Sequence, residues 1–340
     1  MAARLPEPAP IRELDGLAPG VLDDALMGST EPVVLRGLAS SWPMVAAARA
    51  SQREAGDYLR RFYRGQQVLA FLGAPEIEGR YFYNEDLSGF NYATVKAPLD
   101  RVLEELDKHR DDPRPSSVYV GSTMIDHYLP GFRGENDLDL GARQPLVSIW
   151  IGNRSRIAAH HDVPDNIAVV AAGRRRFTLF PPEQVSNLYI GPLDFNPAGQ
   201  AISLVDFAKP DLERFPRFAQ AMESAQVAEL EPGDAIFIPS MWWHHIEALA
   251  PFNALVNYWW RATPAYMDSP ISALMLGLLT LRELPPAQRR AWQELFRHYI
   301  FESDGSEAEH IPPAARRMLA PLDEDGARAL RSHLLNRLNR

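Results

Sequence analysis

The sequence predicts a mainly β protein with helical additions, built around a double-sheet jelly roll or a small barrel. Between about residues 145 and 262 the chain consists of short apolar segments separated by Gly, Pro and Asn. Segments of this kind are typical of strands, and their close spacing leaves no room for helices between them. Proline is also abundant, with 29 residues, which suits many short strands and loops better than a helical bundle.

Eight segments in this region are candidate strands, and they define a core domain over residues 141–262. Gly173 and the pair Pro232-Gly233 fall between candidates, where both residue types favour turns. The predicted strands cover residues 146–151, 167–171, 177–180, 201–205, 227–230, 235–238, 245–249 and 254–260.

Residues 1–140 are expected to form a mixed α/β segment that completes the core domain. Residues 31–35 and 68–72 are short apolar runs of the kind found in strands. Residues 99–108 carry their apolar side chains at helical spacing, which predicts a short amphipathic helix.

Residues 263–340 are expected to form a separate helical region. Ser269 followed by Pro270 is a helix start signal, because serine favours the N-cap and proline the first helical position. Residues 271–281 are apolar on nearly every side, so both faces of this helix should be covered. Two further apolar stripes comprise Trp292, Leu295, Phe296, Tyr299 and Ile300, and then Leu330, Leu334, Leu335 and Leu338.

Two interpretations of this helical region are open. It can be a cap that packs on the β core, or it can join two copies of the chain. The helix over residues 271–281 has more apolar surface than one neighbour can cover, which favours a homodimer through the C-terminal helices.

Composition narrows the function classes. The formal charge of −9 argues against broad binding to nucleic acid or to an anionic membrane. The absence of cysteine excludes disulfides, thiolate metal sites and a cysteine nucleophile. The first ten residues lack the apolar core of a signal peptide, and residues 271–281 are too few to span a bilayer. A soluble cytoplasmic protein is therefore expected, without nucleic-acid or membrane partners.

The strongest functional signal is a set of three metal-ligand side chains, His160, Asp162 and His244. Side chains two residues apart on a strand point to the same face, so His160 and Asp162 can bind one ion while His161 faces away. His244 begins the penultimate predicted strand, which in a jelly roll can lie beside the first pair. Two imidazoles and one carboxylate are the facial ligand set of non-haem Fe(II), and they leave three positions open.

Other interpretations of these residues remain. His-x-Asp alone is a weak pattern among nine histidines, and a histidine can bond a nearby carboxylate for structural reasons only. Zinc uses similar ligands. His161 and His245 are the competing donors, and His245 is the main alternative for the third ligand.

Several motifs together resemble the JmjC/cupin-like oxygenases, and within them the asparaginyl hydroxylase branch. The resemblance spans most of residues 30–262, and it rests on the combination because no single motif is specific. The motifs are EPVVL at 31–35, RYFYN at 80–84, HHDVPDN at 160–166, GRRRFTLFPP at 173–182, PGDAIFIP at 232–239, WWHHI at 242–246 and VNYW at 256–259.

The resemblance implies a double-stranded β-helix that binds Fe(II) through His160, Asp162 and His244, with 2-oxoglutarate as co-substrate. It also implies a reaction that couples decarboxylation of 2-oxoglutarate to succinate with hydroxylation of a C–H bond. By the same resemblance, the aromatic residues Tyr83 and Trp259 would line the mouth of the site near the substrate.

Four further residues match co-substrate contacts in the family. Asn166 and Asn257 match residues near the metal end, and Tyr119 matches a tyrosine that reaches the distal carboxylate. Arg175 lies where these enzymes commonly have lysine. The sequence departs from the hydroxylase branch at Ile157, where a threonine is usual, so one hydroxyl to the distal carboxylate would be missing.

The residues themselves support the role of Arg175. It follows the Gly173 turn and shares a strand face with Phe177 and Leu179, so it can point inward. A guanidinium also pairs with a carboxylate through two parallel hydrogen bonds, which lysine cannot form. The alternative is that residues 174–176 form a solvated basic turn.

The sequence therefore predicts an Fe(II)- and 2-oxoglutarate-dependent hydroxylase of a protein side chain or a small molecule. N-methyl demethylation by the same chemistry is an alternative. Two other classes remain, namely a non-catalytic or isomerase-type metal-binding cupin and an interaction protein with a structural metal.

Overall fold

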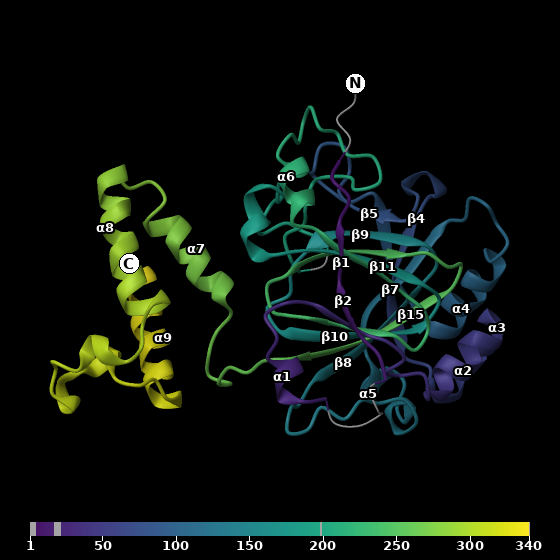
Figure 1. Ribbon diagram of the computed structural model, residues 1–340, viewed down its shortest axis with the longest axis horizontal. Helices are drawn as coiled ribbons and strands as arrows, with labels where there is room; N and C mark the ends of the chain where they lie inside the picture. Colours follow the sequence, from purple (N-terminus) through teal and green to yellow (C-terminus); the bar gives the residue numbers. More distant parts are fainter. Residues whose placement is uncertain (1–4, 17–21, 198, 340) are drawn as a thin grey trace. The chain divides into compact units, whose positions relative to one another are not determined.

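The computed structural model describes residues 5–16, 22–197 and 199–339. The chain divides into two compact units, Met1–Arg261 and Ala262–Arg340. Residues 1–4 and 17–21 of the predicted segment 1–140 lie outside the described residues. In Figure 1 the strands all belong to the larger unit, whereas the smaller unit is drawn as helices and loops.

The core of the larger unit is a jelly roll of eight strands. Strands β8, β10, β13 and β15 lie side by side in a nine-stranded sheet, and strands β9, β11, β12 and β14 lie side by side in a six-stranded sheet. The pairs within each set are antiparallel. The predicted mainly β fold with a double-stranded β-helix core is confirmed. The bounds are β8 Leu146–Gly152, β9 Ser155–His160, β10 Asp165–Ala172, β11 Arg175–Phe180, β12 Gln226–Leu230, β13 Ala235–Ile238, β14 Trp243–Ala248 and β15 Asn253–Trp260.

The N-terminal half of the larger unit extends both sheets. Five strands join the nine-stranded sheet at its two edges: β2 Arg12–Leu14, β3 Val33–Leu35, β4 Gln67–Gly73, β6 Tyr92–Pro98 and β7 Ser117–Met124. The strands β1 (Ala9–Pro10) and β5 (Arg80–Tyr81) form the edges of the six-stranded sheet. The strands predicted over 31–35 and 68–72 are therefore present, as β3 and β4.

Helices cover one face of the nine-stranded sheet. Helices α2 (Pro43–Ala50), α3 (Gln52–Phe62) and α4 (Leu99–Lys108) bury their apolar side chains in the same cluster as residues of β4, β7, β8 and β10. Helix α4 is the predicted helix over 99–108. Because these helices occupy one face of the sheet, its other face is left to line the interior of the jelly roll (Figure 1).

Shorter helices complete the larger unit. They are α1 (Asp24–Met27), α5 (Ile125–Tyr128) and α6 (Phe218–Glu223). Helix α6 lies in the long connection between β11 and β12 and packs its buried Phe218 and Ala221 into a small cluster with Phe180 of β11.

Two strand predictions were wrong. Residues 201–205 form only an isolated bridge from Ser203 to Ile190, in the connection between β11 and β12. The apolar side chains Ile202 and Val205 of this segment are nevertheless buried. The apolar residues that predicted a strand are therefore explained by burial and not by strand pairing. The strand β9 was not predicted, because its six residues include Ser155, Arg156 and two alanines in place of a clear alternation of apolar and polar residues.

The smaller unit consists of three main helices, α7 (Pro270–Thr280), α8 (Pro286–Phe296) and α9 (Glu324–Leu338). Helix α7 begins at Pro270 as predicted, although the Ser269 side chain makes no capping hydrogen bond. The Tyr266 hydroxyl donates to the Leu322 carbonyl and links the start of this unit to the segment before α9. Among the helices of the described residues, none is both long and apolar enough to cross a membrane.

Candidate metal centre

The two predicted histidine ligands lie opposite each other on paired strands. Strand β14 pairs with β9, and His244 is the direct cross-strand partner of His160. Their ring centroids are 4.3 Å apart. The pairing shifts by one residue between His160 and Ile157, so a bulge in β9 lets both residues face the interior although they are three positions apart.

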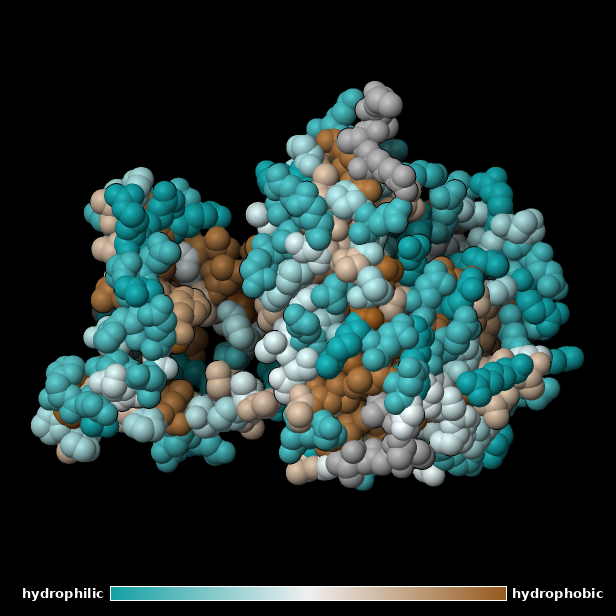
Figure 2. Space-filling view, in the orientation of Figure 1, coloured by the Kyte–Doolittle hydropathy of each residue, from teal (hydrophilic) through white to brown (hydrophobic). Residues whose placement is uncertain are grey.

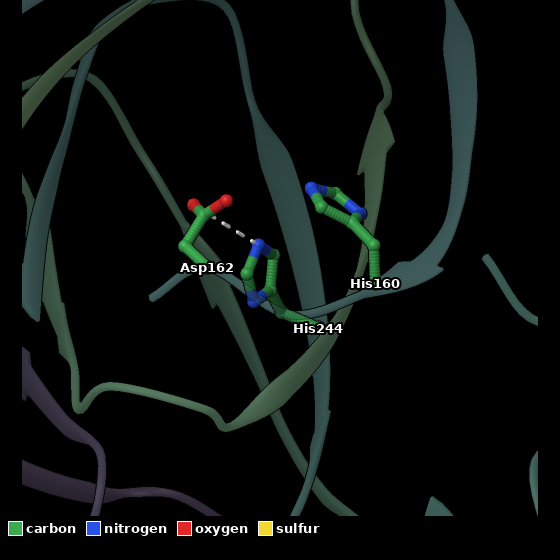
Figure 3. A group of neighbouring side chains, drawn as sticks. All are labelled: His160, Asp162 and His244. Carbon is green, nitrogen blue, oxygen red and sulfur yellow. Dashed lines mark ion pairs between the residues drawn. The ribbon is translucent and has the colours of Figure 1, made fainter. Parts of the chain in front are cut away.

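Asp162 completes the group from the segment that follows β9 (Figure 3). Its backbone carbonyl accepts a hydrogen bond from the Met241 amide at 2.9 Å, which fixes this segment to the turn before β14. The carboxylate oxygen Oδ2 lies 3.7 Å from Nε2 of His244. One ligand atom from each of the three residues lies within 4.8 Å of the others, so the predicted group is brought together.

The tautomers of both histidines suit a metal. Nδ1 of His160 lies 2.9 Å from the Ala158 carbonyl, and Nδ1 of His244 lies 2.9 Å from the Trp242 carbonyl. Because a carbonyl only accepts, each Nδ1 must carry the proton, which leaves the Nε2 lone pairs free. Backbone carbonyls that hold metal-binding imidazoles in this way are the usual second layer of such sites.

His244 is also held in its neutral form. Burial, and after it the neighbouring His160, lower its pKa to about 4, so the imidazole carries no charge near neutral pH. A neutral imidazole is the metal-binding form. Two imidazoles and one carboxylate on one side of an open space fit Fe(II) with its facial ligand set.

The two competing histidines point elsewhere. His161 packs its ring edge-on against Trp243, with centroids 4.7 Å apart, as its position between the two ligands predicted. His245 is buried beside Phe207, with ring centroids 4.4 Å apart, and burial lowers its pKa to about 3. Neither belongs to the metal group that the described residues form.

The metal group opens into a cavity of about 680 Å³ within the jelly roll. This volume lies in the range of roughly 300–1,000 Å³ that is common for ligand pockets. The predicted co-substrate residues all line it, namely Tyr119, Asn166, Arg175 and Asn257. Leu179 of β11 is the cross-strand partner of His244 on β14, and Arg175 lies four residues from Leu179 along β11. At the rise of a β-strand, this spacing places Arg175 roughly 13 Å along the sheet from the metal group.

Arg175 is a buried cation, and no residue that the structure describes gives it a counter-charge. Its side chain is 2% exposed, and its Nε has no hydrogen-bond partner among the described residues. Burial lowers its pKa to about 10, which still leaves the guanidinium charged at neutral pH. The prediction that it points inward is confirmed, whereas its neighbours Arg174 and Arg176 are exposed to solvent or nearly so.

Three further polar residues of the cavity, Tyr119, Asn166 and Asn257, are uncharged. The Tyr119 side chain is buried near Arg175, and burial raises the pKa of its hydroxyl, so it stays a hydrogen-bond donor. Asn257 donates to Oδ1 of Asn166 at 2.8 Å, and the Oδ1 of Asn257 has no partner among the described residues. Ile157 lines the cavity without offering a hydroxyl.

The structure separates the two predicted mouth residues. Trp259 lines the cavity, and its indole Nε1 donates to Oδ2 of Asp162 at 3.1 Å. Tyr83 is 3% exposed, its hydroxyl donates to the Phe195 carbonyl, and it is not among the described residues that line the cavity. Its ring packs against Phe90 and Phe195, and the expectation that Tyr83 lies near the substrate stays a prediction.

Substitution of Trp259 by phenylalanine is expected to weaken metal binding by about 10- to 100-fold. The ring volume is largely kept, but Asp162 loses the donor that orients its carboxylate. The measurement is the dissociation constant for Mn(II) or Fe(II) under anaerobic conditions. Trp150→Phe is the matched control, since Trp150 lines the same cavity without bonding the ligand residue; equal losses in both variants would contradict the role of the hydrogen bond.

A group of aromatic side chains lines this cavity without having been predicted from the sequence. Phe71, Tyr81, Tyr92 and Trp150 come from four strands, three of them outside the predicted core domain. Only Trp150 carried a signal, because it alternates with Leu146 along a predicted strand and both face the interior. The other three reach the cavity through sheet pairing that the sequence does not reveal.

Comparison with known proteins gives concordant similarities. A family model described as a cupin-like domain matches residues 20–266. The chain is 26% identical over 272 residues to lysine-specific demethylase JMJ31 of Arabidopsis thaliana, covering 70% of this chain and 48% of the relative. It is 29% identical over 294 residues to human HSPB1-associated protein 1, covering 79% and 56%. It is 36% identical over 121 residues to tRNA wybutosine-synthesizing protein 5 of Danio rerio, covering 36% and 32%.

The chain thus spans about half the length of the first two relatives. The match to the family model, in contrast, includes both sheets of the jelly roll and all three residues of the metal group. The chain therefore belongs to the cupin-like domain family, in agreement with its resemblance to the JmjC/cupin-like oxygenases.

Proposed function

We propose that this protein is an Fe(II)- and 2-oxoglutarate-dependent dioxygenase that hydroxylates a C–H bond. One observation carries the proposal: a metal-binding group and a buried arginine without a counter-charge share one cavity. A lone buried guanidinium is costly unless an anion binds it, so its presence indicates an anionic ligand. The ligand must reach from Arg175 to the metal, which fits a dicarboxylate with a metal-chelating end.

The described residues divide the binding of such a co-substrate between them. Arg175 and the Tyr119 hydroxyl would hold the distal carboxylate, with the two parallel bonds of the guanidinium fixing its plane. The Asn166–Asn257 pair would orient the end near the metal, because Asn166 is the cross-strand partner of Trp259, which donates to Asp162. His160, Asp162 and His244 would bind the iron.

Bound together, Fe(II) and 2-oxoglutarate supply the oxidative chemistry, in which decarboxylation to succinate is coupled to hydroxylation of the substrate. The protein contributes geometry and exclusion of water. His160, Asp162 and His244 would hold the metal from one side and would leave its remaining positions to ligands in the cavity. Apolar walls such as Ile157, Ile246 and Leu255 keep that space dry, which protects the oxidising equivalent from side reactions.

The substrate is a protein side chain or a small molecule. Two relatives are named lysine-specific demethylase, and another is named for wybutosine synthesis in tRNA, so members with similar sequences differ in what their names say they act on. N-methyl demethylation would follow from the same chemistry. An isomerase-type or non-catalytic cupin is less well supported, because neither needs a partnerless arginine at the far end of the cavity.

The test is an anaerobic titration of the protein with Fe(II) and 2-oxoglutarate. A weak visible charge-transfer band is expected when the keto acid chelates the iron. Glutarate, which lacks the keto group, is the matched control and should give no band. If the wild-type protein binds Fe(II) but gives no band with 2-oxoglutarate, the proposal fails.

We also propose that the C-terminal unit forms a homodimer. Helix α7 exposes a row of large apolar side chains, with Leu274 49%, Met275 57% and Leu279 74% exposed. Figure 2 shows the corresponding apolar surface over α7. An exposed apolar surface of this kind on a soluble protein marks an association site. The expected absence of nucleic-acid partners and the cytoplasmic location stay predictions.

Light scattering at micromolar concentration should give twice the chain mass of 38.2 kDa. Leu274→Glu should lower the mass to that of one chain, because a buried unpaired carboxylate opposes association. Val185→Glu is the matched control, since Val185 is 50% exposed in the larger unit. A wild-type monomer would refute the dimer.

A further inference from the structure

Asp162 lies in an irregular segment between β9 and β10. Strand β9 ends at His160 and β10 begins at Asp165, so the third ligand residue of the metal group belongs to neither strand. A carboxylate ligand must be held to within about 0.5 Å of its productive position to complete a metal site. Strand pairing does not fix Asp162, and contacts from another part of the chain must therefore hold it.

The turn between β13 and β14, residues 239–242, supplies these contacts. Its residue Ser240 bonds the irregular segment on both sides of Pro164. The hydroxyl of Ser240 donates to the Val163 carbonyl at 2.6 Å, and its backbone amide donates to Oδ1 of Asp165 at 2.9 Å. Pro164 stiffens the segment, because its ring fixes its own φ and restricts Val163 to extended conformations. Residues 162–165 are thereby tied to one turn.

The shape of this turn directs a further donor at Asp162. The Trp242 amide donates to the Pro239 carbonyl at 3.3 Å, which closes a β-turn with Met241 at its third position. Met241 has a φ of 68° and Ser240 has a negative φ, a combination that is typical of a type II turn. Types I and II differ by a flip of the central peptide, which carries the Met241 amide. In the observed form this amide donates to the Asp162 carbonyl at 2.9 Å.

The backbone of Met241 is held in a conformation that its residue type disfavours. A φ in the left-handed region suits glycine, whereas the Cβ of any other residue crowds the backbone there. The Met241 side chain is 39% exposed, so its packing gives only part of the compensation. The amides of Ser240 and Met241 are both bonded to the segment around Asp162, and these bonds hold the turn in its form. Strain that is maintained by surrounding contacts is typical of functional sites.

The carboxylate of Asp162 has a separate anchor. It accepts from the Trp259 indole, and Trp259 is the cross-strand partner of Asn166. Asn166 directly follows Asp165, whose carboxylate accepts from the turn. The anchor of the backbone and the anchor of the carboxylate therefore meet β10 at adjacent residues, which fixes Asp162 from two sides.

We propose that Asp165, Ser240 and the left-handed backbone of Met241 act as positioning residues that hold Asp162 in place to bind the metal. The inference rests on the metal centre of the proposed function, and it assigns a role to three residues that lie outside the described cavity lining. Asp165 acts as a hydrogen-bond acceptor and not through its charge. Met241 acts through its backbone and not through its side chain.

Two substitutions of Asp165 separate the acceptor from the charge. Asp165→Ala removes both, whereas Asp165→Asn keeps an oxygen that can accept from the Ser240 amide. Asp165→Ala is expected to weaken Co(II) binding to the full-length protein about tenfold or more, and Asp165→Asn less than about threefold. The visible bands of bound Co(II) report the arrangement of its ligands, so they should change in the alanine variant and stay the same in the asparagine variant.

Two substitutions of Met241 separate the backbone from the side chain. Met241→Gly removes the side chain and favours the observed φ, so the affinity for Co(II) should stay within about twofold of wild type or rise. Met241→Val keeps an apolar side chain, but a β-branched residue is strongly disfavoured at positive φ. The turn should then change its form, and the affinity should fall about tenfold.

Asp23→Ala is the matched control. Oδ1 of Asp23 accepts from the Leu26 amide at 2.7 Å, a part-buried bond of the same kind as that of Asp165, and Asp23 lies outside the described cavity lining. This variant should lose stability in the metal-free form and still bind Co(II) as tightly as wild type. Chemical denaturation of each metal-free variant establishes that it is folded before the titration. If Asp165→Ala does not fold, the two Met241 variants still decide.

Three results would overturn the inference. One is an Asp165→Ala protein that binds Co(II) with the affinity and the visible bands of wild type. Another is an equal loss of affinity in Asp165→Ala and Asp165→Asn, because the charge would then be the cause. The last is an equal loss in Met241→Gly and Met241→Val. A wild-type protein that binds no Co(II) would instead contradict the metal centre and with it the proposed function.

Discussion

His244→Ala is expected to abolish specific metal binding, with a loss of affinity greater than 100-fold. The reason is that one of the three donors disappears from a site in which each donor is fixed by its own hydrogen bond. A remaining pair of donors cannot reproduce a facial set. The measurement is metal content after dialysis, together with the visible band that Fe(II) and 2-oxoglutarate should give.

The control for this change is His161→Ala. His161 is also a histidine and lies between the proposed ligands His160 and Asp162 in the sequence, but its ring packs on Trp243. Its removal is expected to cost some packing energy and to leave one metal ion bound per chain. If His161→Ala loses the metal and His244→Ala retains it, the assignment of the ligands is wrong.

Arg175→Met is expected to weaken 2-oxoglutarate binding and, at the same time, to stabilise the free protein. Because the guanidinium is buried and no described residue gives it a counter-charge, it destabilises the folded protein when no co-substrate is bound. Methionine has a similar length and removes the charge, which should raise the free energy of unfolding by about 1–3 kcal/mol at pH 7. The loss of a buried charge contact to the co-substrate should raise its dissociation constant by about 100-fold.

The stabilisation should also depend on pH in a defined direction. Burial lowers the pKa of Arg175 to about 10, below its value in the unfolded chain. The folded state therefore binds the proton of Arg175 less tightly than the unfolded chain does. The resulting loss of folding free energy is fully present below pH 10 and diminishes as the pH rises through that value. Chemical denaturation of both proteins at pH 7 and at pH 10.5 measures the difference, which should be smaller at the higher pH.

Two further substitutions complete this test. Arg176→Met, on the exposed side of the same strand, should change neither binding nor stability by much. Arg175→Lys should recover part of the affinity, because lysine keeps the charge but not the two parallel bonds. An Arg175→Met protein that is less stable than wild type and binds 2-oxoglutarate normally would mean that the arginine serves the fold and not the ligand.

The core of the fold was predictable because its signals are local. Seven of the eight proposed strands in the jelly roll correspond to strands of the structure, since each is a short apolar run that ends at a turn. The turn at Gly173 has a φ of 74°, and its Cβ position lies 2.3 Å from Asn253 Oδ1, so glycine is required there. Residues 201–205 show the limit of this reasoning, because an apolar segment can be buried without pairing.

The metal group was also predictable in part. The spacing of His160 and Asp162 and the motif around His244 named the ligands, but the parity argument assumed a strand through Asp162. The strand ends at His160, and Asp162 reaches the group because the Met241 amide and the Trp259 indole hold it. His161 lies outside the group and packs on Trp243, whereas the choice between His244 and His245 needed the register of β9 and β14.

By itself the sequence determined the class of the protein and the identity of the metal-binding side chains, since these depend on residue type and short spacing. Tertiary structure decided which way Arg175 points, that no described residue gives it a counter-charge, and that Phe71, Tyr81 and Tyr92 line the cavity. Those facts depend on pairing between strands far apart in the chain. The desolvation of a side chain and the charges that surround it in a cavity are set only when those strands have paired.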